Sequence, residues 1–150
     1  MKEQEKELWL LTERLTQTFI HRKDIYARQS PQGGYACAHR PFSSRLMYQH
    51  LKGEITLGTY LLDQESRAWY TVLDADDDIT GLIEVAQGFT AQNQPCYLEP
   101  SRRGGHLWFF FREPVAGQLA HRFGLWVAHE YGLAVEVYPK QEQLTTGPGS

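Results

Sequence analysis

The sequence predicts a mixed α/β (α+β) fold, and three observations support this prediction. Segments with a helical spacing of apolar residues alternate with short apolar strands along the chain. From Trp69 onward the order of these elements is strand, helix, strand, strand, helix, strand. A length of 150 residues, 41% of them hydrophobic, is enough to build one sizeable core. We therefore expect a single domain over residues 1–150.

Residues 1–66 are expected to form an N-terminal α/β layer. Apolar residues from Leu8 to Phe19 recur every three or four positions with charged residues between them, which predicts a helix from about Lys2 to Ile20. A loop rich in turn residues, Ser30–Gly34, follows this helix. The elements predicted next are a strand at Tyr35–Ala38, a helix at Ser44–Lys52 and a strand at Thr56–Leu62.

Residues 67–141 are expected to form the core of the fold. Its order, βαββαβ, is the split βαβ unit of ferredoxin-like and RNA-recognition-motif-like (RRM-like) sheets. In that topology the first and third strands lie in the middle of the sheet and the fourth lies beside the first, so functional groups on these three strands converge. The predicted strands are Trp69–Asp74, Cys96–Glu99, His106–Phe111 and Leu133–Tyr138, and the predicted helices are Asp78–Thr90 and Pro114–Tyr131.

Composition excludes several classes of protein. The longest apolar runs, such as Leu107–Phe111, are far shorter than the roughly 20 residues of a membrane span, and the N-terminal residues lack the apolar core of a signal peptide. The two cysteines, Cys37 and Cys96, have neither the spacing of a zinc site nor the density of a disulfide framework. We therefore expect a cytoplasmic protein without a membrane partner.

The net charge of −3 conceals two blocks of opposite sign. Residues 14–52 hold seven basic residues against one acid, and residues 53–90 hold eight acids against one base. Such blocks are typical of a basic surface for a polyanion beside an acidic site for a cation. Solvated faces without a ligand explain the same pattern equally well.

Four carboxylates lie within Asp74–Asp78, directly after an apolar strand. Asp78 is predicted to cap the next helix. Asp74 and Asp76, two positions apart at a strand end, can share divalent cations as the two-metal sites of polymerases and nucleases do. An EF-hand is excluded, because Ile79 stands where its calcium loop needs glycine. An acidic surface loop is the alternative to a metal site.

The segment Ser101–His106 joins two predicted strands and combines a serine, two arginines, two glycines and a histidine. The guanidinium groups of Arg102 and Arg103 suit phosphate oxygens, and the glycines let backbone amides approach a ligand. The composition of the segment therefore predicts a phosphate-binding turn. An ordinary hairpin turn, with His106 as a core histidine, is the alternative. The aromatic run Leu107–Phe111 favours a buried central strand over a base-stacking surface.

Taken together, these segments resemble the archaeo-eukaryotic primase superfamily, the primase-polymerases, and in particular the primase domains of TOTE conflict systems and their CRISPR-associated relatives. The first motif of the family is matched by Asp74-Ala75-Asp76, the second by Ser101–Trp108 and the third by Glu136 within Val135–Gln141. The flanking segments that also resemble that subgroup are Asp24–Arg28, Gly33–Tyr35, His50–Gly53 and Thr56–Tyr60. The resemblance covers about residues 22–141.

The resemblance implies template-directed nucleotidyl transfer, in which the domain makes or extends primers. A 3′-hydroxyl attacks the α-phosphate of a nucleoside triphosphate, and pyrophosphate leaves. The catalytic residues, which would also hold Mg²⁺ or Mn²⁺, are Asp74, Asp76 and Glu136. The residues that would bind the triphosphate are Ser101, Arg102, Arg103, His106 and Lys140.

The basic block would contact a single-stranded DNA or RNA template or primer, through Arg22, Arg28 and Arg45. A non-catalytic module that binds nucleotide or single-stranded nucleic acid needs only the His106 turn and this surface, whereas a metal-dependent nuclease would use the same carboxylates. The intact carboxylate trio favours the primase-polymerase.

In the family the catalytic domain continues past the third motif. The chain is therefore expected either to end inside a longer domain, with Gly147–Gly149 as a turn that leads into another strand, or to be a member reduced to a nucleotide-binding core. Further domains or other conflict-system proteins are the expected partners.

Overall fold

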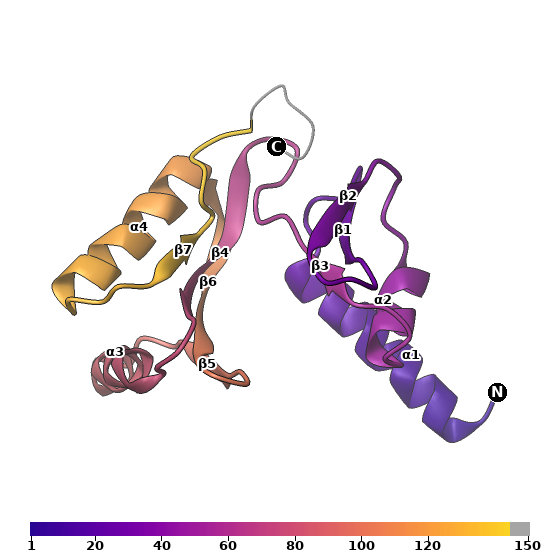
Figure 1. The fold of residues 1–150 in the computed structure, drawn as a ribbon, viewed down its shortest axis with the longest axis horizontal. Coiled ribbons are helices and arrows are strands. Elements are labelled where there is room, and N and C mark those ends of the chain that lie inside the picture. The colour runs from indigo at the N-terminus through magenta and orange to yellow at the C-terminus, as the bar shows by residue number, and fades with distance from the viewer. Residues whose placement is uncertain (145–150) are drawn as a thin grey trace. The chain divides into compact units, whose positions relative to one another are not determined.

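A computed structural model of the chain describes residues 1–144, which form two compact units, residues 1–64 and residues 65–144 (Figure 1). Within the described residues each unit contains one antiparallel sheet and two helices. The mixed α/β fold expected from the sequence is confirmed at this level. The turn expected at Gly147–Gly149 lies outside the described residues. No helix between residues 1 and 144 is both long enough and apolar enough to cross a membrane.

The first unit combines two helices with a three-stranded sheet in which β1 lies between β2 and β3. The two helices pack against each other, and the rings of Trp9 and Tyr48 stack with centroids 4.3 Å apart. Its elements are α1 (Glu3–Phe19), β1 (Tyr26–Gln29), β2 (Tyr35–Ala38), α2 (Ser44–Leu51) and β3 (Leu57–Gly58).

Two strands of the first unit differ from the sequence prediction. The sequence pattern does not predict β1, which forms a hairpin with β2. The loop between them contains Gly33 and Gly34 at φ values of 84° and 76°, a conformation that glycine adopts at no steric cost. Of the strand predicted at Thr56–Leu62, only Leu57–Gly58 form a strand, which pairs with Ala27 and Arg28 of β1, and Leu62 forms an isolated bridge.

The second unit contains a four-stranded sheet with the order β5-β6-β4-β7. Both helices cover one face of this sheet, where Leu73, Leu107 and Val137 pack with Leu82 of α3 and Val127 of α4. The elements are β4 (Arg67–Ala75), α3 (Thr80–Ala91), β5 (Tyr97–Pro100), β6 (Gly105–Ala116), α4 (Gly117–Glu130) and β7 (Glu136–Tyr138). The observed sheet thus has β4 and β6, the first and third strands of this unit, in the middle, and β7, the fourth strand, beside β4.

The boundary between β6 and α4 differs from the prediction. Pro114 is predicted as the first helical residue, because proline favours that position. Instead β6 continues to Ala116 and α4 begins at Gly117. The two residues after Pro114 pair with the start of β4, and Pro114 itself lies where the pairing is irregular between Ala68 and Tyr70. A proline, which has no N–H to donate, is tolerated in a strand at such an irregularity.

Candidate functional site

A single row of polar side chains crosses all four strands of the second unit. Asp74 in β4 pairs with His106 in β6 on one side and with Glu136 in β7 on the other, and His106 pairs with Glu99 in β5. Directly paired residues point to the same face of a sheet. Because the neighbour of Asp74 in β4, Leu73, is in the core under the helices, this row lies on the opposite face.

His106 is held between two carboxylates of this row. Its Nδ1 atom lies 2.5 Å from Glu99 Oε1, and its Nε2 atom lies 3.5 Å from Asp74 Oδ1. The side chain of His106 is 33% exposed, so the ring is accessible from outside while both nitrogens have a carboxylate neighbour. His106 is thus not a core histidine, which was the alternative from the sequence.

The row opens into a pocket of about 570 Å³ within the second unit. The pocket brings the aspartate segment and the serine-glycine turn to the same place, and its lining residues are Asp74, Ala75, Asp76, Ser101, Arg102, Arg103 and His106. Both arginines are exposed, and neither forms an ion pair with any residue in the described part of the chain. The pocket therefore has two guanidinium groups and two carboxylates among its lining side chains.

The glycines of the turn allow it to press against the aspartate segment. A Cβ atom on Gly104 would lie 1.8 Å from the carbonyl oxygen of Ala75, and one on Gly105 would lie 2.8 Å from the carbonyl oxygen of Glu99. Ser101 closes the turn, because its hydroxyl accepts a hydrogen bond from the Gly104 N–H at 3.2 Å. At Gly104 the missing side chain thus makes room for the chain's own backbone rather than for a ligand.

The carboxylates of the site influence one another. Burial raises the pKa of Asp74, the charge of His106 opposes this effect, and the negative charges of Asp76 and Glu136 add to it. Asp78 lies outside this group, since its carboxylate accepts a hydrogen bond from the Thr80 N–H at 2.9 Å. The N-cap position of α3 is Ile79 rather than the predicted Asp78, so Asp78 binds the first helical N–H from one residue before the cap.

The fit of these residues to a divalent cation is partial. Carboxylate oxygens are the ligands that Mg²⁺ and Mn²⁺ prefer, so the donor chemistry suits a hard cation. Across residues 1–144, however, no three His, Cys, Asp or Glu side chains are arranged closely enough to hold a metal ion. Glu136 is instead engaged by its neighbours: Tyr138 Oη donates to Oε2 at 2.9 Å, and Lys140 Nζ donates to Oε1 at 3.2 Å. These two hydrogen bonds lower the pKa of Glu136.

The structure brings together most of the site residues expected from the sequence. Asp74, Asp76 and the segment from Ser101 to His106 share the pocket, and Glu136 pairs with Asp74 from the neighbouring strand. Lys140 donates a hydrogen bond to Glu136, and neither of these two residues lines the pocket.

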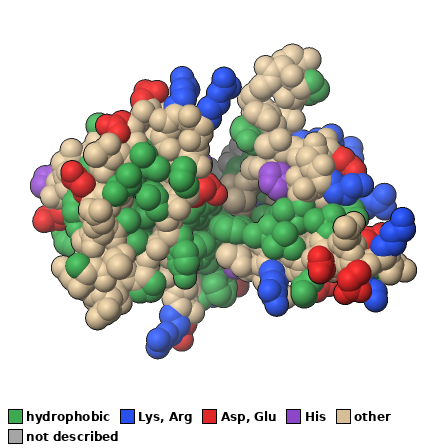
Figure 2. Space-filling view, turned by 90° about the horizontal axis from the view of Figure 1, so that it is seen from below, with side chains coloured by type: hydrophobic (Ala, Val, Ile, Leu, Met, Phe, Trp, Pro, Cys, Tyr) green, Lys and Arg blue, Asp and Glu red, His purple; other side chains and the backbone are tan. Residues whose placement is uncertain are grey.

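The three arginines expected to contact nucleic acid have different surroundings in the first unit. Arg22 is bound to Asp24, with Nε 2.5 Å from Oδ1. Arg28 and Arg45 line two different pockets of the first unit. Figure 2 shows Lys and Arg side chains spread over the right-hand part of the view, with acidic side chains among them. On this face the basic residues are distributed rather than gathered into one patch.

Two residues of the site are not found by the sequence reasoning, Glu99 and Tyr138. Glu99 contacts His106, and Tyr138 contacts Glu136. The signal for Tyr138 is present in the sequence, because two residues apart in one strand share a face. The signal for Glu99 is the length of the hairpin loop, which sets the residue that pairs with His106.

Comparison with known protein families connects this geometry to a described domain. The family model of the archaeo-eukaryotic primase domain of TOTE conflict systems matches residues 12–148. The matched region contains every lining residue of the pocket, Glu136 and Lys140. A search of curated proteins finds none that matches the chain.

Proposed function

The chain belongs to the archaeo-eukaryotic primase domains of TOTE conflict systems, and on this basis we propose that it catalyses template-directed nucleotidyl transfer from nucleoside triphosphates. The 3′-oxygen of a primer or first nucleotide forms a bond to the α-phosphorus. The bond from that phosphorus to the bridging oxygen breaks, pyrophosphate leaves and the hydroxyl proton is released. The product is a new or extended primer.

The pocket shared by Asp74, Asp76, Arg102, Arg103 and His106 is the observation that carries this proposal. A nucleoside triphosphate is a polyanion that reacts while bound to a divalent cation, and the pocket is lined by both cationic and carboxylate groups. The two arginines bind the phosphate oxygens, since guanidinium groups match phosphate geometry. His106, kept in place at Nδ1 by Glu99, donates to the triphosphate from Nε2 when its ring is doubly protonated. Ser101 supports this arrangement by closing the turn.

Asp74 and Asp76 are the proposed ligands of Mg²⁺ or Mn²⁺, and Glu136 is the third carboxylate of the group. At these carboxylates a bound cation would supply neutralisation of the charge that develops in the transition state and a lower pKa of the attacking hydroxyl. Burial and the neighbouring charges of Asp76 and Glu136 make the ionised form of Asp74 unfavourable. A cation bound beside Asp74 would reduce this repulsion. Lys140 balances the charge of Glu136 until then.

We assign the sheet of the second unit to the RRM-like class, because its element order βαββαβ and strand order β5-β6-β4-β7 are those of that class. Residues 67–141 then form the catalytic core. Residues 1–66 form a layer that contributes to binding of the single-stranded template or primer. Together they act as one primase-polymerase domain.

A second candidate function is a binding module without catalysis. The pairing of Glu136 with Tyr138 and Lys140 favours it, since this carboxylate is not free to act as a third ligand in the structure. Such a module keeps nucleotide binding through the arginines and His106 and loses transfer.

A primer synthesis and extension assay tests the proposal and separates the two functions. The protein is incubated with a single-stranded template, ribo- or deoxyribonucleoside triphosphates, and Mg²⁺ or Mn²⁺, with and without a primer. We expect labelled product with the parent protein and none with the variant Asp74→Asn/Asp76→Asn. Nucleotide binding without product in any of these mixtures would favour the binding module, and neither binding nor product would contradict both functions.

A further inference from the structure

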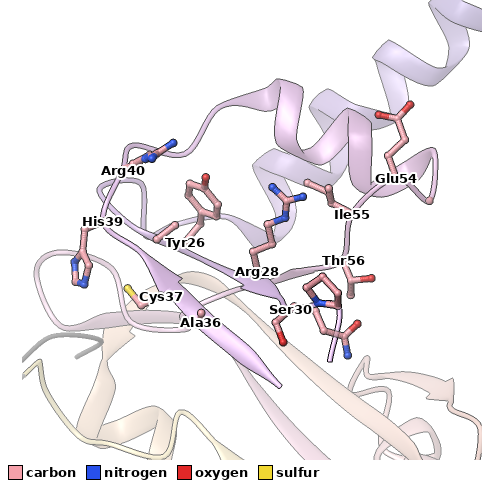
Figure 3. A pocket seen from close by; sticks show the side chains of 14 residues that line it. Tyr26, Arg28, Ser30, Ala36, Cys37, His39, Arg40, Glu54, Ile55 and Thr56 are labelled. Atoms are coloured by element: carbon pink, nitrogen blue, oxygen red, sulfur yellow. The ribbon is translucent and has the colours of Figure 1, made fainter. Parts of the chain in front are cut away.

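The first unit contains a pocket of its own, which the proposed chemistry does not use. It has a volume of about 740 Å³ and lies between the β1–β2 hairpin and the segment from Gly53 to Thr56 (Figure 3). Tyr26 and Arg28 are two residues apart in β1 and therefore project from the same face. In Figure 3 the Tyr26 ring rises beside Arg40, and Arg28 extends toward Ile55.

Small residues keep this pocket open. The residues that pair with Tyr26 and Arg28 across the hairpin are Ala38 and Ala36. Because directly paired residues share a face, two methyl groups form the floor beside the aromatic ring and the guanidinium group. A flat group can therefore lie against Tyr26 without displacing a side chain of β2.

The pocket carries an excess of positive charge. Arg28 and Arg40 are both exposed, and within residues 1–144 neither has a carboxylate at ion-pair distance. Glu54 is the acidic residue of the lining, and its Oε1 atom is already bound to Lys52 Nζ at 2.8 Å. Two guanidinium groups without a partner beside an aromatic ring indicate a ligand that combines phosphate with a flat ring.

We propose that this hairpin pocket binds a segment of single-stranded nucleic acid, with backbone phosphates on Arg28 and Arg40 and a base against Tyr26. The inference rests on the proposed function, for which a template or primer strand is a substrate. Proteins that bind single strands combine a basic groove with an aromatic platform, and this pocket has both. A free nucleoside triphosphate fits it less well, because the triphosphate travels with a divalent cation and the pocket offers no pair of carboxylates to hold that cation.

Salt-dependent binding of a labelled oligonucleotide tests this assignment. The full chain is titrated with a fluorescent single-stranded DNA and, separately, RNA, at several salt concentrations. We expect Arg28→Gln and Arg40→Gln each to reduce the slope of log affinity against log salt by about 0.7, which lowers the affinity about fivefold at 0.1 M salt. Arg28→Lys should retain the slope, because it retains the charge. Tyr26→Ala should lower the affinity at least about fivefold, and Tyr26→Phe should retain it.

Two controls separate the pocket from general charge and from the site of the second unit. Arg14→Gln removes an exposed arginine on α1 outside this pocket and should leave affinity and slope close to those of the parent. The pocket variants should bind a nucleoside triphosphate as the parent does, whereas His106→Ala should weaken that binding and retain strand affinity.

The outcomes are distinct for the inference and for the proposed function. A parent protein that binds no single strand, or pocket variants indistinguishable from Arg14→Gln, would overturn the inference while triphosphate binding and transfer still stand. Loss of triphosphate binding in the pocket variants would assign the pocket to the free nucleotide and would overturn the inference as well. Strand binding that depends on Arg28, Arg40 and Tyr26 in a protein that performs no transfer would support the inference and count against catalysis.

Discussion

Glu99 and His106 face each other across β5 and β6, and the Glu99 Oε1 atom lies 2.5 Å from the His106 Nδ1 atom. A carboxylate oxygen accepts hydrogen bonds, so this contact favours the forms of the ring that carry a proton on Nδ1. The contact fixes the orientation of the ring and leaves Nε2 on the side of Asp74 and the pocket. Glu99 is therefore a positioning residue for His106 in the proposed function.

Glu99→Ala should weaken the binding of nucleoside triphosphate by about fivefold, because the His106 ring loses a hydrogen bond worth about 1 kcal/mol that holds it in place. The effect should appear in the dissociation constant measured by isothermal titration calorimetry. Glu99→Gln should be the milder variant, since its amide oxygen can still accept from Nδ1. A matched control is Glu84→Gln, an exposed glutamate of α3 that does not line the pocket. Equal affinities for Glu99→Ala and Glu84→Gln would remove the positioning role.

Gly104→Ala should disturb both the fold and the site, because its Cβ atom would lie 1.8 Å from the backbone oxygen of Ala75. Overpacking of this kind typically lowers the free energy of unfolding by about 1–3 kcal/mol, and contact with backbone belongs at the upper end of that range. We expect a loss of that size in the free energy of unfolding in urea, together with weaker nucleotide binding. Gly132→Ala is the control: Gly132 has a φ of 63° and open space around it, so the loss should be about 1 kcal/mol with nucleotide affinity retained. An unchanged stability of Gly104→Ala would mean that the turn does not press on the aspartate segment.

The sequence predicts long, periodic elements better than short or irregular ones. The helix expected at Lys2–Ile20 is found at Glu3–Phe19, because its apolar stripe repeats over several turns. The strand β1 (Tyr26–Gln29) has four residues and no clear alternation, and it forms because β2 pairs with it in a hairpin. The start of α4 is displaced from Pro114 because pairing with β4 extends β6. Tertiary pairing thus overrides local preference at both places.

In the candidate site, too, some features follow from the sequence pattern and others depend on tertiary pairing. The convergence of Asp74, His106 and Glu136 follows from the order of the elements, and the observed register places them in one row. The presence of Glu99 in that row depends on the register of the hairpin, because a shift of one residue would turn its side chain to the helix-covered face. The pairing of Glu136 with Tyr138 and Lys140 depends on side-chain conformations, which no sequence pattern fixes.

Asp74→Asn combined with Asp76→Asn should abolish primer synthesis and extension and leave the metal-free protein at least as stable as the parent. Burial and neighbouring negative charges raise the pKa of Asp74 in the folded state. A raised pKa means that ionisation at pH 7 costs stability, so a neutral amide removes that cost. The melting temperature in EDTA, measured by differential scanning fluorimetry at pH 7, should be equal or slightly higher.

Asp77→Asn provides the control for this double variant, because Asp77 is exposed and does not line the pocket. It should retain primer extension and the melting temperature of the parent. Full activity of the double variant, or a large loss of its stability, would contradict the assignment of Asp74 and Asp76 as metal ligands.

Lys140→Met should change the affinities for cation and for triphosphate in opposite directions. Tyr138 and Lys140 both donate hydrogen bonds to Glu136 and lower its pKa, so the carboxylate is ionised and Lys140 balances its charge. Removal of the ammonium group strengthens the attraction of the site for a cation and weakens its attraction for a polyanion. For an exposed charge pair we expect about a threefold change in each direction. Electron paramagnetic resonance of free Mn²⁺ measures the first affinity, and calorimetry with a nucleoside triphosphate measures the second.

Tyr138→Phe leaves the lysine charge in place and should keep both affinities close to those of the parent. A lower Mn²⁺ affinity in Lys140→Met would show that Glu136 is not part of the cation site, because the freed carboxylate would then have failed to attract the metal.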